Sequence, residues 1–269
     1  MPELPEVETT CRDLVSGGIV GEKIVALEVL WEPTLSNFKG EDLLNVTITE
    51  VSRRGKFILF SLSNGKTLFI HLRMTGSLRY TQKSAPNDPY DRVILLFETT
   101  KMAFRDPRKF GRMTLTVNPE LITNKLGIEP LGDEFTPHRL HQMLQGRSKV
   151  IKTLLLDQSF IAGIGNIYAD ESLFKAQIAP LRRAETITLE EAKRLHSAIV
   201  SLLRAAIVNR GTSLGDGKGN YVSNGKRGEN ARELKIFRKT GAPCPICSTP
   251  IEKIVVGQRA THFCPTCQK

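Results

Sequence analysis

The arrangement of cysteines near the C-terminus constrains the fold more than any other feature of this sequence. Four of the five cysteines form two C-x-x-C pairs, with sixteen residues between the pairs: Cys244, Cys247, Cys264 and Cys267. Two such pairs are typical of a zinc ribbon (a β-hairpin zinc finger), in which four thiolates surround the metal as a tetrahedron. Because all four ligands are cysteines, no position is open for a substrate. We therefore expect one structural Zn²⁺.

A disulfide or a redox-active pair is the alternative interpretation of these cysteines. A disulfide needs an oxidising compartment, and the N-terminal sequence MPELPEVETT has neither the basic nor the apolar region of a signal peptide. A redox C-x-x-C needs a βαβ context, which this segment does not show. A ribbon this short buries little apolar surface, so we expect metal binding to drive its folding.

The excess of positive charge points to a polyanionic partner. The chain has 269 residues, and 38 Lys+Arg against 28 Asp+Glu give a formal charge of +10. Such a charge favours nucleic-acid binding, although a basic surface alone is not specific. The content of 40% hydrophobic residues excludes a disordered or collagen-like chain. No apolar run approaches the ~18 residues that a bilayer requires, so we expect a cytoplasmic protein without a membrane span.

Short alternating stretches predict an N-terminal β domain over residues 1–120. Asn64-Gly65 predicts the turn of a hairpin. Several short strands joined by turns are typical of a β-sandwich or barrel. A helix over 6–16 precedes the strands. The predicted strands cover residues 24–30, 56–62, 67–72, 93–98, 102–104 and 113–117.

The periodicity changes to that of helices over residues 130–212. Thr136-Pro137 predicts a helix that runs to Leu144, because threonine caps a helix and proline suits its first position. Ser148 predicts the cap of a second helix ending at Leu156. Thr188 and Glu191 form the pattern of a capping box at the start of a third helix. His196 lies near the apolar face of that helix, which favours a structural role.

A polar, glycine-rich stretch over residues 213–232 separates the helices from the ribbon at 233–269. A stretch of this length without a pattern is either a linker or a functional loop. Nine Lys/Arg and three Asp/Glu lie between residues 204 and 239, so this join is basic, unless it is an ordinary solvated surface. The sequence thus predicts an α+β multidomain chain, with a β domain, a helical domain, a glycine-rich connection and a zinc ribbon.

The second residue is a potential nucleophile, because removal of Met1 leaves Pro2 with a secondary amine. An α-amino group titrates near 7.7–8.0 and a lysine near 10.4, so far more of the N-terminal amine is neutral at physiological pH. Secondary amines attack aldehydes and hemiacetal carbons to give iminium ions. The adjacent Glu3 can serve as a proton donor. Met-Pro openings are common, so this pattern alone is not specific.

The whole opening is more specific, because MPELPEVET resembles the N-terminal signature of the bacterial formamidopyrimidine-DNA glycosylase family. Further matches to this family follow in order along nearly the full chain, and together they are specific to it. They are RRGK at 53–56, HLRMTGS at 71–77, DPRKFG at 106–111, GIGNIYADE at 163–171 and THFCPTCQ at 261–268.

The resemblance implies catalytic roles for four residues. Pro2 attacks C1′ of the damaged nucleotide and holds the sugar as an iminium, and Glu3 opens the sugar ring. Lys56 contacts the phosphate beside the lesion and donates a proton during β-elimination. Arg259, in the ribbon, binds a flanking phosphate and assists δ-elimination. The residue types agree, since lysine and arginine are the side chains that bind phosphates. Without the resemblance, a solvated lysine at a strand end would be the better interpretation of Lys56.

The resemblance also implies three residues that fill the gap left by an extruded base. Met74, Arg108 and Phe110 match these positions. Their types suit this role, because they are a flexible apolar wedge, a planar cation and an aromatic ring. Judged only by residue type, Met74 and Phe110 are more typical of a hydrophobic core.

Further DNA contacts follow from the resemblance to a helix-two-turn-helix element. Asn166 lies where a glycine-rich turn meets a helix, a place suited to a phosphate, and Arg147 and Lys152 fall on the same basic side. The sequence departs from the family at two places. Tyr90 stands where relatives often have a DNA-contacting histidine, and residues 228–231 lack the aromatic residue that relatives often place near the everted base.

The sequence therefore predicts a monomeric, bifunctional DNA glycosylase/AP lyase that acts on damaged double-stranded DNA. It would excise 8-oxoguanine and formamidopyrimidines through Pro2, cleave the strand by β,δ-elimination, need no cofactor for catalysis, and work at the nucleoid of a bacterium. One alternative is an endonuclease VIII-like enzyme for oxidised pyrimidines, against which Leu4 argues. A non-catalytic zinc-ribbon DNA-binding protein is the other, and it leaves the amino terminus unexplained.

Overall fold

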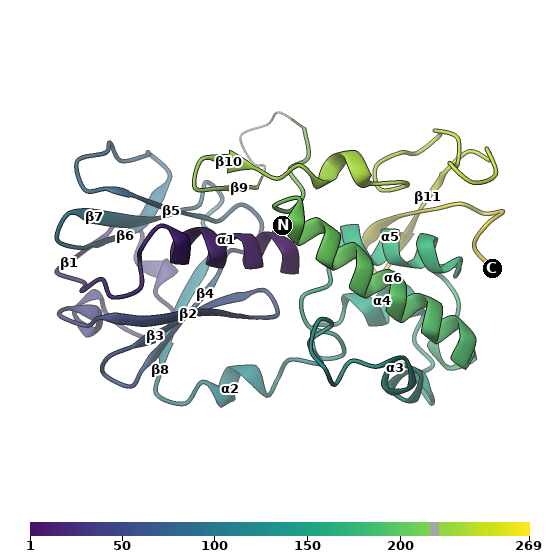
Figure 1. The fold of residues 1–269 in the computed structure, drawn as a ribbon, viewed down its shortest axis with the longest axis horizontal. Helices are drawn as coiled ribbons and strands as arrows, with labels where there is room; N and C mark the ends of the chain where they lie inside the picture. Colours follow the sequence, from purple (N-terminus) through teal and green to yellow (C-terminus); the bar gives the residue numbers. More distant parts are fainter. Residues whose placement is uncertain (216–220) are drawn as a thin grey trace. The chain divides into compact units, whose positions relative to one another are not determined.

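The chain divides into two compact units in the computed structural model, which describes residues 1–215 and 221–269 (Figure 1). Unit 1 consists of residues 1–124 and 209–231, and unit 2 of residues 125–208 and 232–269. This division differs from the four segments predicted. The described part of the glycine-rich connection belongs almost entirely to unit 1, and the ribbon belongs with the helices. Residues 216–220, part of the predicted loop, lie outside the described residues.

Unit 1 starts with one helix and continues with short strands. The helix is α1 (Leu4–Ser16). The longer strands are β1 (Ala26–Val29), β2 (Ile48–Arg54), β3 (Phe57–Leu62), β4 (Thr67–His71), β5 (Ser77–Gln82), β6 (Asp91–Leu96), β7 (Thr100–Arg105) and β8 (Arg112–Thr116). Smaller elements are η1 (Glu32–Thr34), η2 (Gly40–Leu43), α2 (Glu120–Thr123), β9 (Val222–Ser223) and β10 (Lys226–Arg227).

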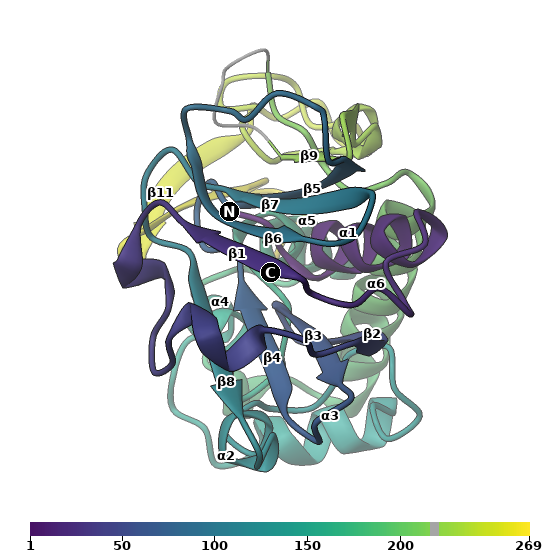
Figure 2. The ribbon, with the colours of Figure 1, turned by 90° about the vertical axis from the view of Figure 1, so that its left-hand side faces the viewer.

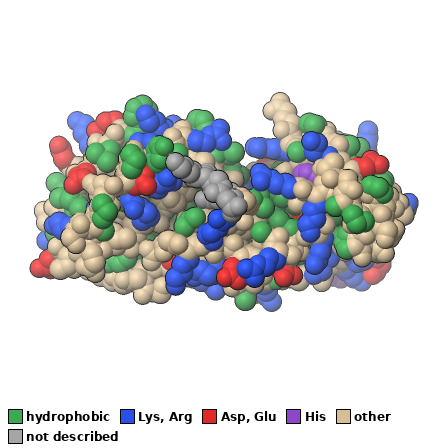
Figure 3. Space-filling view, turned by 90° about the horizontal axis from the view of Figure 1, so that it is seen from above, with side chains coloured by type: hydrophobic (Ala, Val, Ile, Leu, Met, Phe, Trp, Pro, Cys, Tyr) green, Lys and Arg blue, Asp and Glu red, His purple; other side chains and the backbone are tan. Residues whose placement is uncertain are grey.

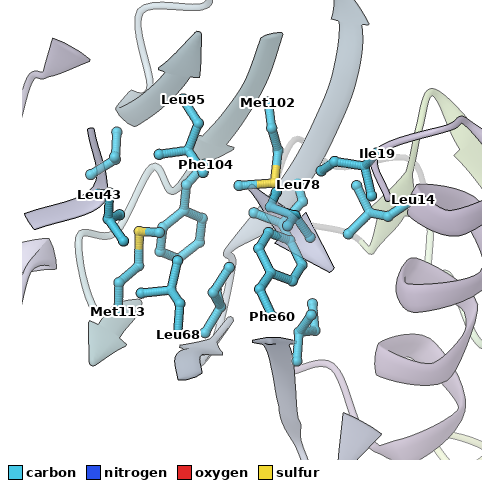
Figure 4. Packing of buried hydrophobic residues seen from close by; sticks show 14 of the residues in the cluster. Leu14, Ile19, Leu43, Phe60, Leu68, Leu78, Leu95, Met102, Phe104 and Met113 are labelled. Atoms are coloured by element: carbon cyan, nitrogen blue, oxygen red, sulfur yellow. The ribbon is translucent and has the colours of Figure 1, made fainter. Parts of the chain in front are cut away.

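The strands of unit 1 form a β-sandwich, as predicted. One antiparallel sheet has the order β1-β6-β7-β5 and the other β2-β3-β4-β8 (Figure 2). Their inner faces share one hydrophobic core, in which Phe60 and Leu68 of one sheet lie near Met102 and Phe104 of the other, and α1 contributes Leu14 (Figure 4). Burial of these side chains is the main source of stability for such a sandwich.

Local signals placed some elements of unit 1 correctly and missed others. The hairpin between β3 and β4 turns at Asn64-Gly65 as predicted, and Gly65 has the positive φ of +77° that such turns need. The strands β2 and β5 were not predicted, because their sequences ITEVSRR and SLRYTQ are polar and only half buried. Helix α1 begins at Leu4, since Pro5 is tolerated in a first turn.

Unit 2 combines helices with the hairpin of the ribbon. The caps predicted at Thr136 and at Thr188 with Glu191 are confirmed by hydrogen bonds to their side chains. The prediction of a cap at Ser148 is wrong: the helix begins at Ile151, because the preceding residue pairs with Arg183 as in a β-bridge. The main elements are α3 (Pro137–Leu144), α4 (Ile151–Leu156), α5 (Asn166–Ala176), η3 (Ala184–Thr186), α6 (Leu189–Val208), β11 (Glu252–Val256) and β12 (Arg259–Phe263), and η4 (Asn230–Glu233) spans the boundary between the two units in the chain.

The core of unit 2 explains two further features. His196 has the structural role predicted, since its Nε2 lies 2.6 Å from the carbonyl oxygen of Phe135. The ribbon packs on the helices, since Ile236 and Ile251 lie in one cluster with Phe174 of α5 and two of the cysteines. Among the described residues, no helix has both the length and the apolar character that crossing a membrane requires.

Candidate active site and zinc centre

The N-terminal residues of unit 1 are held at the start of α1. Pro2 is buried and Glu3, the residue before the helix, is 3% exposed, whereas Met1 is 45% exposed. An exposed Met1 is accessible for removal, which would place the amine of Pro2 beside the carboxyl group of Glu3. These two predicted residues thus lie next to each other, at the positive end of a helix dipole that disfavours an ammonium ion.

Glu6 fixes this arrangement, although it was not among the residues predicted from the sequence. The side chain is 1% exposed. Its Oε2 accepts a hydrogen bond from the backbone N–H of Glu3 at 2.7 Å, and its Oε1 accepts one from the backbone N–H of Thr212 at 2.7 Å. One carboxylate therefore ties the N-terminus to the start of the glycine-rich connection. The spacing of Glu3 and Glu6 is that of a capping box, which is the signal that could have found it.

The described flanks of residues 216–220 are anchored on α1. The hydroxyl of Tyr221 donates to the carbonyl oxygen of Glu6 at 2.9 Å. Asp13 accepts from Ser223 at 2.6 Å and pairs with Arg210 at 2.6 Å. Glu6 and Asp13 lie two turns apart on the same face of the helix. The described flanks of the connection are therefore fixed to α1.

Lys56 lies in the tight turn between β2 and β3 and is buried, with 5% exposure. The turn is held to α1, since Arg53 pairs with Glu8 at 3.1 Å and also donates to the carbonyl oxygen of Gly55 at 3.0 Å. Gly55 has a positive φ of +56°, a conformation that glycine adopts without strain. The alternative of a solvated lysine at a strand end is therefore excluded by its burial.

His71 lies near Lys56, and its neutral imidazole can donate a hydrogen bond. In the sequence it was noted only as part of the motif HLRMTGS. Burial, together with the positive charges of Arg73 and Lys56, lowers the pKa of the imidazole from 6.5 to about 3. Its Nδ1 accepts a hydrogen bond from the N–H of Arg73 at 3.0 Å, which leaves the ring proton on Nε2. A neutral N–H of this kind suits a phosphate oxygen at any working pH.

The stability of unit 1 is expected to fall as the pH drops below the ordinary pKa of histidine. His71 takes up a proton near pH 6.5 when unfolded but stays neutral to a pH of about 3 when folded. Falling pH therefore favours the unfolded state, and between pH 7.5 and pH 5 the loss for one such group is about 2 kcal/mol. Denaturant unfolding followed by the fluorescence of Trp31, the single tryptophan, measures this loss.

Two substitutions separate His71 from other histidines. His71→Gln keeps an N–H donor but cannot titrate, so it should remove most of this pH dependence. His138→Gln, at an exposed histidine of α3, should leave the dependence unchanged. Equal pH dependence in the wild type and His71→Gln would contradict the assignment.

The three predicted void-filling side chains reach the surface of unit 1. Phe110 is 48% exposed, Arg108 is exposed and Met74 is half-buried. The guanidinium of Arg108 lies 4.9 Å from the centroid of the Phe110 ring, a cation–π contact. The alternative that Phe110 belongs to the core is therefore wrong. Tyr90 is also exposed, at 37%, and its ring is covered by Arg105 at 5.0 Å.

In unit 2, the structure brings Asn166 to the strand that carries Arg259. The Nδ2 of Asn166, at the start of α5, donates to the carbonyl oxygen of Ala260 at 2.8 Å. Arg259 is exposed beside the hairpin turn Gly257-Gln258, both of whose residues have positive φ as in a type I′ turn. Arg147 is exposed as well. Lys and Arg side chains are frequent on the face drawn in Figure 3.

The expectation of a direct phosphate contact from Lys152 is corrected by the structure. Its side chain is fully buried and its ammonium forms an ion pair with Asp170. The second oxygen of Asp170 accepts from the backbone N–H of His262 at 3.0 Å. Lys152 therefore stabilises the interior of unit 2, because breaking a buried pair leaves an uncompensated charge.

Helix α5 holds the ribbon with a second buried carboxylate that was not predicted from the sequence. Glu171 is 2% exposed and accepts hydrogen bonds from the backbone N–H groups of three residues at the entry to the ribbon, Lys235, Ile236 and Phe237. Two adjacent acidic residues, Asp170 and Glu171, followed by the apolar Leu173 and Phe174 were the available signal, since buried charges need partners.

The four predicted zinc ligands converge in the ribbon. Among the described residues, Cys244, Cys247, Cys264 and Cys267 form a cluster whose sulfur atoms all lie within 4.8 Å of one another. Tetrahedral Zn²⁺ with a Zn–S distance of about 2.3 Å places sulfurs about 3.8 Å apart. The observed separations of 3.8 Å and 3.4 Å across the cluster fit such an ion. The metal would link the two C-x-x-C turns and leave no open coordination position.

Three family profiles match successive parts of the chain. The Formamidopyrimidine-DNA glycosylase N-terminal domain matches residues 1–113, the Formamidopyrimidine-DNA glycosylase H2TH domain matches 126–216, and the zinc finger found in FPG and IleRS matches 241–269. Together these profiles cover both structural units and the predicted zinc ribbon.

Full-length relatives and solved structures agree with the profiles. The formamidopyrimidine-DNA glycosylases of Protochlamydia amoebophila and Herpetosiphon aurantiacus are 44% and 43% identical, with 100% of each chain covered. A Lactococcus lactis FPG mutant bound to Fapy-dG containing DNA is 35% identical, with a TM-score of 0.92 and 100% coverage of both chains. The wild-type Lactococcus lactis enzyme with an oxidized pyrimidine containing DNA gives a TM-score of 0.91 at 35% identity, again with 100% of both chains covered. The chain belongs to the formamidopyrimidine-DNA glycosylase family.

Proposed function

We propose that this DNA glycosylase of base excision repair excises oxidised purines through a Schiff base on Pro2 and then cleaves the strand by β,δ-elimination. The observation that carries the proposal is the N-terminal arrangement of unit 1. Pro2 and Glu3 are buried side by side at the start of α1, and the carboxylate of Glu6 holds the backbone N–H of Glu3 at 2.7 Å.

The amine and the acid have distinct roles in this chemistry. The nitrogen of Pro2 forms a bond to C1′ as the damaged base departs, and opening of the sugar ring gives an iminium ion. Glu3 delivers a proton to the ring oxygen, which is the role expected of a carboxylic acid next to the reacting carbon. The iminium then withdraws electrons from the sugar, so the 3′ and 5′ phosphates leave in turn by elimination.

The phosphates are bound by donors from both units. In unit 1, Lys56 and the neutral N–H of His71 bind the phosphate beside the lesion. In unit 2, the neighbouring phosphates are bound by Asn166, Arg147 and Arg259. Charged donors of this kind supply most of the affinity for DNA and make it depend strongly on salt. A monomer acting in the cytoplasm on chromosomal DNA fits these contacts.

Excision from an 8-oxoguanine:cytosine duplex tests the proposal. Glu3→Gln is expected to slow release of the base at least about 100-fold, because it removes the proton donor. Glu41→Gln changes an exposed carboxylate of the same unit and should keep the wild-type rate. Unchanged excision by Glu3→Gln would contradict the assigned role.

The same assay separates oxidised purines from oxidised pyrimidines. Since a relative has been captured with an oxidised pyrimidine, the informative quantity is the ratio of single-turnover rates on 8-oxoguanine and on 5-hydroxycytosine. We expect the purine to be released faster. A ratio in favour of the pyrimidine would support the endonuclease VIII-like alternative, and binding without release of either base would support a non-catalytic protein.

A further inference from the structure

Two surface turns of unit 1 share one buried carboxylate. The first turn carries Met74 and the second carries Arg108 and Phe110. Asp106, which is 1% exposed, connects them. Its Oδ1 accepts from the hydroxyl of Thr75 at 2.5 Å and from the backbone N–H of Arg108 at 3.2 Å, and its Oδ2 accepts from the backbone N–H of Gly111 at 2.7 Å.

The two turns also rest on the same aromatic ring. Phe104 of β7 is fully buried in the sandwich core (Figure 4). A Cβ added to Gly111 would lie 2.3 Å from an atom of this ring, and one added to Gly76 would lie 2.9 Å from another. Only glycine permits such a close approach. Both turns therefore pack against Phe104, the first at Gly76 and the second at Gly111.

The backbone of Asp106 is itself fixed from the neighbouring strand. Its N–H donates to the carbonyl oxygen of Tyr90 at 2.9 Å, and its carbonyl oxygen accepts from Nε of Arg92 at 2.8 Å. The carboxylate therefore has little freedom to follow a displacement of either turn. A displacement of one turn would break its hydrogen bond to Asp106. The displacement could pass to the other turn only at a cost in free energy.

We propose that Asp106 is a positioning residue that sets Met74 relative to Arg108 and Phe110, so that the three side chains enter the duplex as one rigid wedge. This inference rests on the proposed function and on the role that the family resemblance implies for these side chains, which is to fill the gap left by the extruded base. Preorganisation matters here because Arg108 and Phe110 are exposed and Met74 is only half-buried, so an unanchored turn would have to be ordered at the moment of binding.

Asparagine at position 106 breaks this arrangement with little change of shape. A carboxylate accepts hydrogen bonds at both oxygens, whereas an amide accepts at one and donates at the other. Whichever way the amide is turned, a backbone N–H of the second turn faces its NH₂ group, either that of Arg108 or that of Gly111. Asp106→Asn therefore weakens the hold on the turn that carries Arg108 and Phe110, whereas the Thr75 hydroxyl can still bond to the amide. Thr75→Val removes only the connection to the Met74 turn.

Comparison of two substrates measures the effect on base extrusion. The first substrate is a duplex with 8-oxoguanine opposite cytosine, and the second has a preformed abasic site, at which no base pair must be opened. Single-turnover rates are measured for both, together with the fluorescence of 2-aminopurine next to the lesion, which reports unstacking.

Asp106→Asn is expected to slow base excision and the fluorescence change about 10- to 100-fold, the range for loss of charge-assisted hydrogen bonds. Thr75→Val should slow both about tenfold, and Thr75→Ser, which keeps the hydroxyl, should restore the wild-type rates. Cleavage at the abasic site should change less than about threefold in all three variants, because the Pro2 chemistry does not need the wedge.

Met74→Ala and Phe110→Ala distinguish failure of this inference from failure of the proposed function. If these two variants slow base excision but Asp106→Asn does not, the positioning role of Asp106 is overturned and void filling stands. If neither alanine variant has an effect, void filling itself fails. An equal slowing of both substrates by Asp106→Asn, with Thr75→Val and Thr75→Ser alike, would show a general loss of structure and would also overturn the inference.

Discussion

Replacement of Pro2 by glycine is expected to reduce borohydride trapping on an 8-oxoguanine:cytosine duplex at least about 100-fold. Proline offers a secondary amine, which condenses with the sugar carbon to give an iminium ion that borohydride reduces to a stable adduct. Its ring also fixes the direction of the nitrogen lone pair at the start of α1, where Pro2 is buried. Glycine gives a mobile primary amine, whose imine must gain a proton before the elimination can proceed.

The trapping experiment has a matched proline control. Pro119→Ala changes a proline beside α2, away from the N-terminus, and should give the wild-type yield of adduct on a denaturing gel. Undiminished trapping by Pro2→Gly would show that the secondary amine of proline is not required, because either the glycine amine or another amine, such as that of the buried Lys56, forms the adduct. A chain from which Met1 has not been removed should give no adduct, because its Pro2 nitrogen is part of a peptide bond.

Cys247→Ser is expected to lose zinc and DNA affinity together. Structural zinc contributes about 10–16 kcal/mol to the folding of zinc-finger peptides. Here two of the ligands, Cys244 and Cys264, are also part of the small core with Phe174. Loss of the metal should therefore unfold the hairpin that carries Arg259, and binding of damaged duplex should weaken at least about tenfold. Metal analysis and fluorescence anisotropy on the same samples measure the two effects.

Cys11→Ala provides the control for the zinc experiment. Cys11 is buried in the core of unit 1, outside the cluster, so this variant should retain one zinc per chain and bind DNA as the wild type does. The fluorescence of Trp31 should show that unit 1 stays folded in Cys247→Ser. Full DNA affinity in a metal-free sample would show that the ribbon takes no part in binding.

Signals that act over a few residues predicted their elements well. The capping pattern of Thr188 and Glu191, the proline after Thr136 and the Asn64-Gly65 turn each formed as expected, because the partners are neighbours in the chain. The helix cap expected at Ser148 did not form, since a pairing with Arg183 displaced the start of α4. That pairing joins residues more than thirty positions apart, and no local pattern records it.

Burial of the polar and aromatic site residues depended on the tertiary structure in the same way. Both Lys152 and Phe110 were predicted to touch DNA from the family resemblance. In the fold one is fully buried against Asp170, whereas the other is half exposed beside Arg108. Which side of an element faces the core is decided by what packs against it, and this information lies in distant segments.

The sequence by itself determined the family, the zinc ligands and the chemistry available at Pro2 and Glu3, because these depend on residue identity and short spacing. Only the tertiary structure decided that Glu6 joins the N-terminus to the glycine-rich connection, and that Asp106 joins two turns. A buried carboxylate must find donors wherever the fold brings them. Its partners are therefore fixed by packing between remote parts of the chain and cannot be read from its neighbours.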